Sequence, residues 1–266
     1  MAGNSGEPGR SVTSKVLAIL GAFSVAHSEL TLAQIARRTG LPVPTVHRLA
    51  RELVAWGGLE RLPDGTYRIG LRLWEIGSLA PQQRRIRQIA IPFMEDLYEA
   101  THGNIQLAVR EGGEALYIEK ISGRYAVPIV SRVGGRLPLH ATGVGKILLA
   151  FAPQEVIDQV LTAGLARLTP KTIVMPGKLL RALAEVRRTG LAFCYEEMTL
   201  GSVSVATPIH GPDQSVIAAL SIVVHSFPAD AQRFAPAVRT AGLGISRQLA
   251  RMDSAAPEAF ARQVAR

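Results

Sequence analysis

The chain has 266 residues, 47% of them hydrophobic and 19% charged, which gives it the length of about two domains and excludes general disorder. Its net charge of +9 is typical of proteins that contact phosphate backbones. The single cysteine, Cys194, excludes an internal disulfide and a cysteine-cluster metal site, and no apolar run reaches the roughly 20 residues of a membrane span. We expect a cytoplasmic protein that makes no membrane contact and uses no metal and no cofactor.

The first forty residues predict two helices. Residues 1–10, rich in Gly and Ser, are expected to be a disordered lead, and residues 12–24 have apolar side chains at helical spacing. Thr31 and Gln34 fit a capping box at the start of a second helix, and Gly40 fits the left-handed cap that ends it.

A third helix is expected to begin near Pro44, after a short turn. Its apolar stripe leaves a polar, cationic face exposed. The segments 59–62 and 67–69 flank Asp64 and Gly65, which predicts a β-hairpin. Helix, capped helix, turn, helix and hairpin in this order indicate a winged helix-turn-helix over residues 11–72.

A winged helix-turn-helix inserts its third helix into the major groove of DNA, where arginine can bond guanine. Arg48 and Arg51 are the candidates for reading bases, and Thr45 and His47 precede them. Arg61 and Arg68 on the hairpin, with Arg37 and Arg38 on the second helix, are expected to position the DNA backbone. The alternative is that these side chains form only a solvated face.

Residues 73–84 are expected to form a linker helix, with breaks near Pro81 and Pro92 and a hinge at residues 82–85. A second domain is then expected over residues 85–254, followed by a tail at residues 255–266. In it, strands are predicted at residues 105–109, 115–119, 127–133, 191–195, 203–208 and 216–224. Helices are predicted at residues 143–152, 154–161, 177–189 and 229–252. This mixture predicts an α+β domain with an antiparallel sheet flanked by helices.

Several segments together resemble one protein family. These are residues 11–20, 31–41, 45–49 and 65–70 in the first domain, and residues 137–146, 190–192, 201–209 and 218–221 in the second. They are similar to the landmarks of the IclR family of bacterial regulators, in the same order. The resemblance implies a GAF-like α/β effector-binding domain after the winged helix-turn-helix and its helical linker. It also implies a homodimer that can pair into a tetramer, and operator DNA binding modulated by a small organic acid or aromatic metabolite.

Two departures from the family pattern matter. Many members have a cysteine where Ser204 stands and an acidic residue near Cys194, so the pocket here is less acidic and another member's ligand cannot be carried over. Pro42 and Pro44 stand where Ser or Lys often begins the recognition helix, which removes a side-chain cap and a phosphate contact.

The candidate effector site begins at Ala141, Thr142, Gly143 and Val144. These residues precede or open a helix, whose free backbone N–H groups can receive a carboxylate. The alternative is a tight joint without a ligand. Ser202, Ser204 and Ser221 are polar residues in apolar strands, where a ligand or a backbone carbonyl must satisfy each hydroxyl. Cys194 joins this set, although an inert buried thiol is the more common role.

No catalytic arrangement is visible, so we expect a protein that is not an enzyme. Glu196 and Glu197 are adjacent and would point opposite ways in an extended segment, so a solvated acidic pair is expected. Two other functions stay open. One is a small-molecule hydrolase with Ser204 or Ser221 as nucleophile, and the other is an architectural DNA binder that responds to no ligand.

Overall fold

The computed structural model describes residues 11–24, 26–124, 126–226 and 231–264, with side chains to residue 252. The expected disordered lead lies outside these residues. The chain divides into two compact units, residues 1–84 and residues 85–266. Among the described helices, none combines the length and the apolar character needed to cross a membrane.

The N-terminal unit has the predicted helix-turn-helix order. Its elements are α1 (Val12–Gly21), β1 (Glu29–Leu30), α2 (Leu32–Thr39), α3 (Val43–Trp56), β2 (Leu59–Arg61) and β3 (Tyr67–Ile69). The strands form a small antiparallel sheet in the order β1-β3-β2, so the predicted hairpin is confirmed and gains a third strand. Buried residues of the three helices and the sheet make one core, with Ile35, Leu49 and Tyr67 near its centre.

The ends of α2 and the start of α3 are fixed by local bonds. Gln34 N donates to Thr31 Oγ1 at 3.2 Å, and Thr31 N donates to Gln34 Oε1 at 2.7 Å, so the predicted capping box is present. Gly40 takes φ 70°, which lets the chain turn sharply. The third helix begins at Val43, and Pro44 in its first turn lacks only a hydrogen-bond donor that would have had no partner there.

The segment after the hairpin differs from the prediction. α4 (Leu71–Ser78) and α5 (Pro81–Thr101) are separated at Leu79 and Ala80, next to the predicted break at Pro81. Residues 82–85 are helical within α5, so a break of the helix there is wrong, although the boundary between the two compact units falls among them, between residues 84 and 85. The expected break at Pro92 is also wrong. Ile86, Ile89, Ala90, Met94 and Leu97 of α5 are buried in the core, and this packing holds the helix together across the proline.

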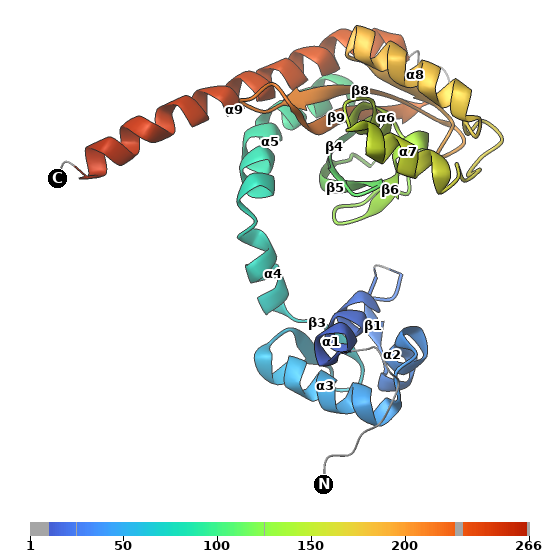
Figure 1. Ribbon diagram of the computed structural model, residues 1–266, viewed down its shortest axis with the longest axis vertical. Coiled ribbons are helices and arrows are strands. Elements are labelled where there is room, and N and C mark those ends of the chain that lie inside the picture. Colours follow the sequence, from blue (N-terminus) through green and yellow to red (C-terminus); the bar gives the residue numbers. More distant parts are fainter. Residues whose placement is uncertain (1–10, 25, 125, 227–230, 265–266) are drawn as a thin grey trace. The chain divides into compact units, whose positions relative to one another are not determined.

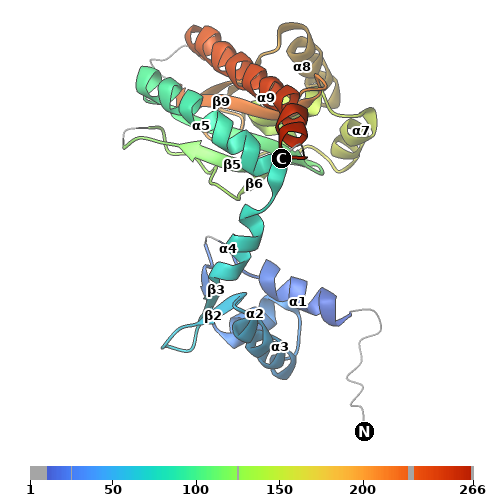
Figure 2. The same ribbon diagram turned by 90° about the vertical axis from the view of Figure 1, so that its left-hand side faces the viewer.

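The C-terminal unit is a six-stranded antiparallel sheet with helices on both faces. The strands are β4 (Asn104–Glu111), β5 (Glu114–Ile121), β6 (Arg136–Pro138), β7 (Ala192–Tyr195), β8 (Ser202–His210) and β9 (Val216–His225), in the order β6-β5-β4-β9-β8-β7. The helices are α6 (Gly143–Ala150), α7 (Gln154–Thr162), α8 (Pro176–Thr189) and α9 (Ala235–Val264). α5 and α9 lie side by side on one face, and α6, α7 and α8 cover the other (Figures 1 and 2).

Alternate residues of each strand face these two layers. Ile105, Leu107, Leu220 and Ile222 pack against α5 and α9. The opposite face of the sheet carries small residues beneath α6, namely Ala108, Ala115, Ala192, Ala206 and Ala219. This row of alanines lets α6 approach the sheet closely.

Two further expectations are wrong. Residues 127–133 do not form a strand, because Pro128 lacks an N–H donor and a turn at Gly134 (φ 74°) delays strand pairing until β6. The last helix begins at Ala235, after the short 3₁₀ turn Ala231–Phe234, and continues to Val264 through much of the expected tail.

Candidate functional site

The start of α6 is built to approach the sheet. The 3₁₀ turn Leu139–Ala141 leads into Thr142, whose Oγ1 accepts from Gly145 N at 3.1 Å and caps the helix. A Cβ on Gly143 would lie 2.8 Å from Ser204 Oγ, and one on Gly145 would lie 2.4 Å from the backbone oxygen of Leu139. Gly143 thus lies against strand β8, and Gly145 lies against the turn that leads into the helix.

A pocket opens where α6 begins, on the same face of the sheet as the alanine row. Its empty volume is about 380 Å³, part of which is open to solvent. Among the described lining residues there is no Lys, Arg, Asp or Glu. The polar lining residues are Gln106, Tyr117, Ser131, Thr142, Cys194, Thr199, Ser202 and Ser204. The aliphatic lining comes from Ile129, Val130, Leu137, Met198 and Val223. The amides of Gly143 and Val144, which precede the capped amide of Gly145 in the first turn of α6, supply the positive end of the local dipoles.

Hydrogen bonds fix the polar lining. Gln106 Nε2 donates to Ser131 Oγ at 2.6 Å, and Ser221 Oγ donates to Gln106 Oε1 at 3.4 Å. The Tyr117 hydroxyl is hydrogen-bonded to the Thr142 side chain, and burial raises the pKa of Tyr117, so the phenol stays neutral. These bonds hold the pocket walls in place and leave neutral donors and acceptors facing the space between them.

Cys194 is protonated in this setting, as a neutral thiol. Its Sγ donates to the backbone oxygen of Ala141 at 3.2 Å, and burial raises its pKa to about 12. The nearby charge of Lys146 lowers that pKa and the charge of Glu197 raises it again, so the two effects oppose each other.

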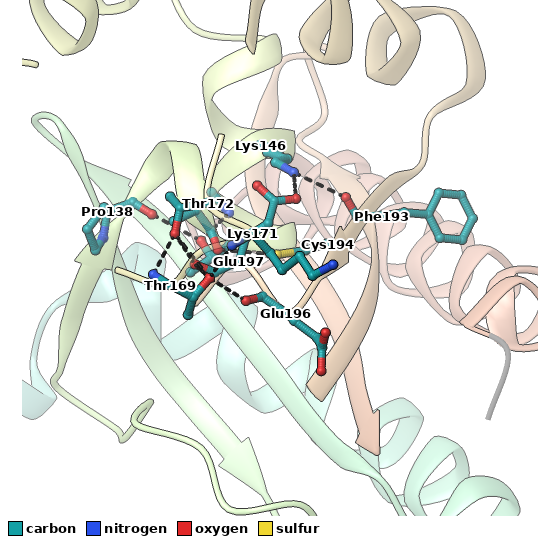
Figure 3. A network of polar contacts seen from close by, with 12 residues as sticks. Pro138, Lys146, Thr169, Lys171, Thr172, Phe193, Cys194, Glu196 and Glu197 are labelled. Atoms are coloured by element: carbon teal, nitrogen blue, oxygen red, sulfur yellow. Dashed lines mark hydrogen bonds and ion pairs between the residues drawn. The ribbon is translucent and has the colours of Figure 1, made fainter. Parts of the chain in front are cut away.

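Behind the pocket lies a buried ion pair that the sequence patterns did not reveal. Lys146 Nζ on α6 donates to Glu197 Oε1 and, at 3.3 Å, to the backbone oxygen of Phe193 (Figure 3). The side chains of Lys146 and Glu197 are only 3% and 6% exposed. The expected solvated acidic pair is therefore wrong for Glu197. The available signal was Lys146 itself, because a lysine in the apolar run from Gly143 to Ala150 needs a buried partner.

The loop that carries Glu197 is held from several sides. Thr169 Oγ1 donates to the backbone oxygen of Glu196 and Thr172 Oγ1 to that of Glu197, each at 2.7 Å (Figure 3). Glu196 has a left-handed backbone, φ 56°, and its Oε1 accepts from Gly201 N at 2.8 Å. The β7–β8 connection is thus a rigid corner beside the pocket.

The structure brings five of the eight predicted effector residues together. Thr142, Gly143, Cys194, Ser202 and Ser204 line the pocket. The other three do not line it: Ala141 accepts the bond from Cys194, Val144 is buried in the core under α6, and Ser221 bonds Gln106. The sequence patterns missed Gln106, Tyr117 and Ser131, because a polar residue in one strand does not reveal which loop lies above it.

A second candidate surface lies on the N-terminal unit. His47, Arg51, Val54, Ala55, Arg61 and Tyr67 line a groove between α3 and the hairpin. His47, Arg48 and Arg51 are exposed and Thr45 is half-buried, while Val46, Leu49 and Leu53 of α3 are buried. The polar face of α3 therefore points to solvent.

The predicted cations of this surface differ in their partners. Arg48 pairs with Glu52 at 2.7 Å, and Arg68 makes two bonds to Glu60, at 2.9 and 3.0 Å. Arg38 Nε donates to the backbone oxygen of Ala22 at 2.9 Å, and Arg37 is exposed on α2. Arg51 and Arg61 form no ion pair within the described part of the chain. The groove thus carries two arginines whose guanidinium groups can donate hydrogen bonds to an anion.

Within the described residues, no group of three or more His, Cys, Asp or Glu side chains is arranged to hold a metal ion.

Comparison with known proteins identifies relatives of both units. Residues 12–63 match the family described as IclR helix-turn-helix domain, and residues 79–247 match Bacterial transcriptional regulator IclR C-terminal. HTH-type transcriptional regulator XynR of Escherichia coli is 35% identical over 240 residues, which cover 88% of this chain and 95% of XynR. HTH-type transcriptional repressor AllR of Escherichia coli is 31% identical over 218 residues, 81% of this chain and 80% of AllR.

A solved structure is similar over most of the chain. It is an IclR homolog from Microbacterium hydrocarbonoxydans complexed with 4-hydroxybenzoate, with a TM-score of 0.86 and 38% identity. The match covers 90% of this chain and 99% of that protein.

The raised pKa of Cys194 predicts a thiol that resists alkylation. With this pKa, the thiolate fraction of Cys194 at pH 8 is about 1000-fold lower than that of a thiol with the ordinary pKa. The thiolate is the form that reacts with alkylating agents. We expect iodoacetamide to label the native protein far more slowly than the chain unfolded in concentrated urea, as measured by mass spectrometry. Equal rates in the two states would contradict the burial of Cys194.

Proposed function

The chain belongs to the IclR family of bacterial transcriptional regulators, and from this we propose that it binds operator DNA through α3 and the hairpin while a small organic acid in the pocket modulates that binding. The observation that carries the proposal is the start of α6, which opens into a pocket of neutral polar groups in a chain that also has a helix-turn-helix. The two activities thus have separate sites in separate units.

In the proposed DNA contact, Arg48 and Arg51 read bases, and Thr45 and His47 approach base or phosphate. Arg61, Arg68, Arg37 and Arg38 hold the DNA backbone. Arg48 must leave Glu52 to do so, and the free energies favour the exchange. An exposed i,i+4 pair contributes about 0.3–0.5 kcal/mol, whereas two bonds to guanine contribute about 1–3 kcal/mol.

In the proposed effector site, a carboxylate accepts hydrogen bonds from the first-turn amides of α6, beside Thr142 and Gly143. The glycine lets the ligand approach the backbone, and Ser202, Ser204 and Cys194 lie opposite. The related structure with bound 4-hydroxybenzoate supports an aromatic hydroxy acid as one ligand of this class. Ala141, Val144 and Ser221 support the pocket from outside it.

We also propose a homodimer formed through the N-terminal unit, which can pair into a tetramer. α4 has no buried residue, and Leu71, Trp74 and Leu79 are 70%, 69% and 68% exposed. Leu17 on α1 is 62% exposed as well. A second copy that presents the same face would cover these apolar side chains, as a two-fold interface requires.

The two other functions have less support. A hydrolase needs a base beside its nucleophile, but Ser221 bonds Gln106 and Ser204 lies against Cys194 and Gly143. We therefore propose a protein that is not an enzyme and that acts on DNA in the cytoplasm. A ligand-independent architectural DNA binder would leave the pocket without a purpose, and the effector titration below distinguishes it.

The two kinds of arginine predict different losses of DNA binding. Arg48→Ala should weaken operator binding by about 1–3 kcal/mol and change non-specific binding much less, because base contacts carry the specificity. Arg61→Ala should weaken both alike and reduce the salt dependence by about one phosphate contact. Fluorescence anisotropy over a salt series measures both, with Arg181→Ala on α8 as control. Equal losses on both DNAs for Arg48→Ala would refute base reading.

The exposed face of α4 predicts a loss of dimerisation. Leu71→Lys places a charge in the proposed interface and should shift the protein from dimer to monomer in sedimentation-velocity experiments. Leu180→Lys, on an exposed position of α8, is the matched control and should leave the assembly unchanged. If Leu71→Lys remains dimeric, the interface lies elsewhere.

The pocket predicts a coupled effect of ligand on DNA. 4-Hydroxybenzoate should raise the melting temperature and change operator affinity by about 5- to 150-fold, the usual range of coupling between two sites. Ser204→Leu fills the pocket and should abolish both responses while DNA binding persists. Unchanged operator affinity at saturating 4-hydroxybenzoate would exclude it as an effector.

A further inference from the structure

The buried pair of Lys146 and Glu197 lies directly behind the pocket. Lys146 is one turn after Gly143, which lines the pocket, and Glu197 immediately precedes Met198, which also lines it. Lys146 Nζ bonds the backbone oxygen of Phe193, the neighbour of Cys194. Both charges act on the thiol of Cys194, which lines the pocket.

The two charges cancel each other. Glu197 Oε1 receives its bond from Lys146, and Glu197 Oε2 has no hydrogen-bond partner in the described part of the chain. Lys146 is thus the only charged group paired with Glu197 there, and the pair presents no net charge to the pocket. Their opposite effects on the Cys194 thiol are consistent with this cancellation.

We infer that Glu197 is a specificity-determining residue which, by holding Lys146 in an ion pair, restricts the pocket to ligands that carry a single negative charge. The inference rests on the proposed effector site. The amides at the start of α6 stabilise one carboxylate, and the neutral lining offers no positive charge to a second one. A dicarboxylate would bury its other charge unpaired, which is strongly unfavourable.

The test compares three para-substituted benzene probes by calorimetric titration of the full-length protein. They are 4-hydroxybenzoate with one charge, terephthalate with two, and 4-hydroxybenzamide with none. In the native protein 4-hydroxybenzoate should bind more tightly than terephthalate. Glu197→Gln frees the charge of Lys146 and should raise the affinity for terephthalate relative to 4-hydroxybenzoate on the order of tenfold.

Two further variants separate charge from structure. Lys146→Gln leaves Glu197 alone and should lower the same ratio. Replacement of both residues by methionine removes the two charges together, and folded proteins often tolerate this replacement of a buried ion pair. The double variant should therefore have the native affinity ratio. The amide should bind all folded variants alike. A structural role would weaken all three probes together and would not give opposite changes in the two single variants.

The outcomes distinguish the two proposals. If no probe binds the native protein, the proposed class of effector fails, and this inference fails with it. If 4-hydroxybenzoate binds but the ratio stays the same in Glu197→Gln and Lys146→Gln, only the role of Glu197 is refuted. If Glu197→Gln does not fold, Lys146→Gln and the double methionine variant decide the question, because the ratio must fall in the first and return in the second.

Discussion

The close approach of α6 to the sheet is the constraint on which the C-terminal unit depends. It depends on Gly143, where a Cβ would lie 2.8 Å from Ser204 Oγ and 3.3 Å from the Ala206 Cβ, and on Gly145, where a Cβ would lie 2.4 Å from the Leu139 oxygen of the turn that leads into the helix. It also requires the row of alanines beneath the helix. Where α6 begins, the same face of the sheet changes from alanine to polar residues, and the pocket occupies the space that opens there. The tight packing and the pocket are thus two parts of one arrangement.

The local chemistry of the N-terminal unit could be predicted from the sequence. Thr31, Gln34 and Gly40 determine where α2 begins and ends through contacts between near neighbours, so their pattern is sufficient. Local signals for the start or end of a helix or strand failed where contacts with residues distant in the sequence determine the structure. Pro92 looked like a break, but the buried side chains around it keep α5 continuous. Residues 127–133 are rich in β-branched residues, as strands are, yet they are fixed by Asn104 and Gln106, which bond Val127 and Ser131.

The candidate site was predictable only in part for the same reason. The residues around the start of α6 and the serines of β8 lie in recognisable segments, and four of these predicted residues line the pocket, as does Cys194 of β7. The ion pair of Lys146 and Glu197 joins residues 51 positions apart, so neither motif nor spacing connects them. The same holds for the arginines of the N-terminal unit. The sequence predicts that they are exposed but does not show that Arg48 and Arg68 are paired with Glu52 and Glu60.

Strand β4 has a position that gives it a mechanical role. Its Gln106 faces the pocket, while Ile105 and Leu107, the residues on either side, are packed in the core with Ile89 and Met94 of α5. Closely packed interiors transmit small displacements rather than absorb them. Under the proposed regulation, a ligand that moves Gln106 would act, through the thickness of a single strand, on α5, whose first residues belong to the N-terminal unit. The proposed coupling thus needs no longer chain of residues than this one between the pocket and α5.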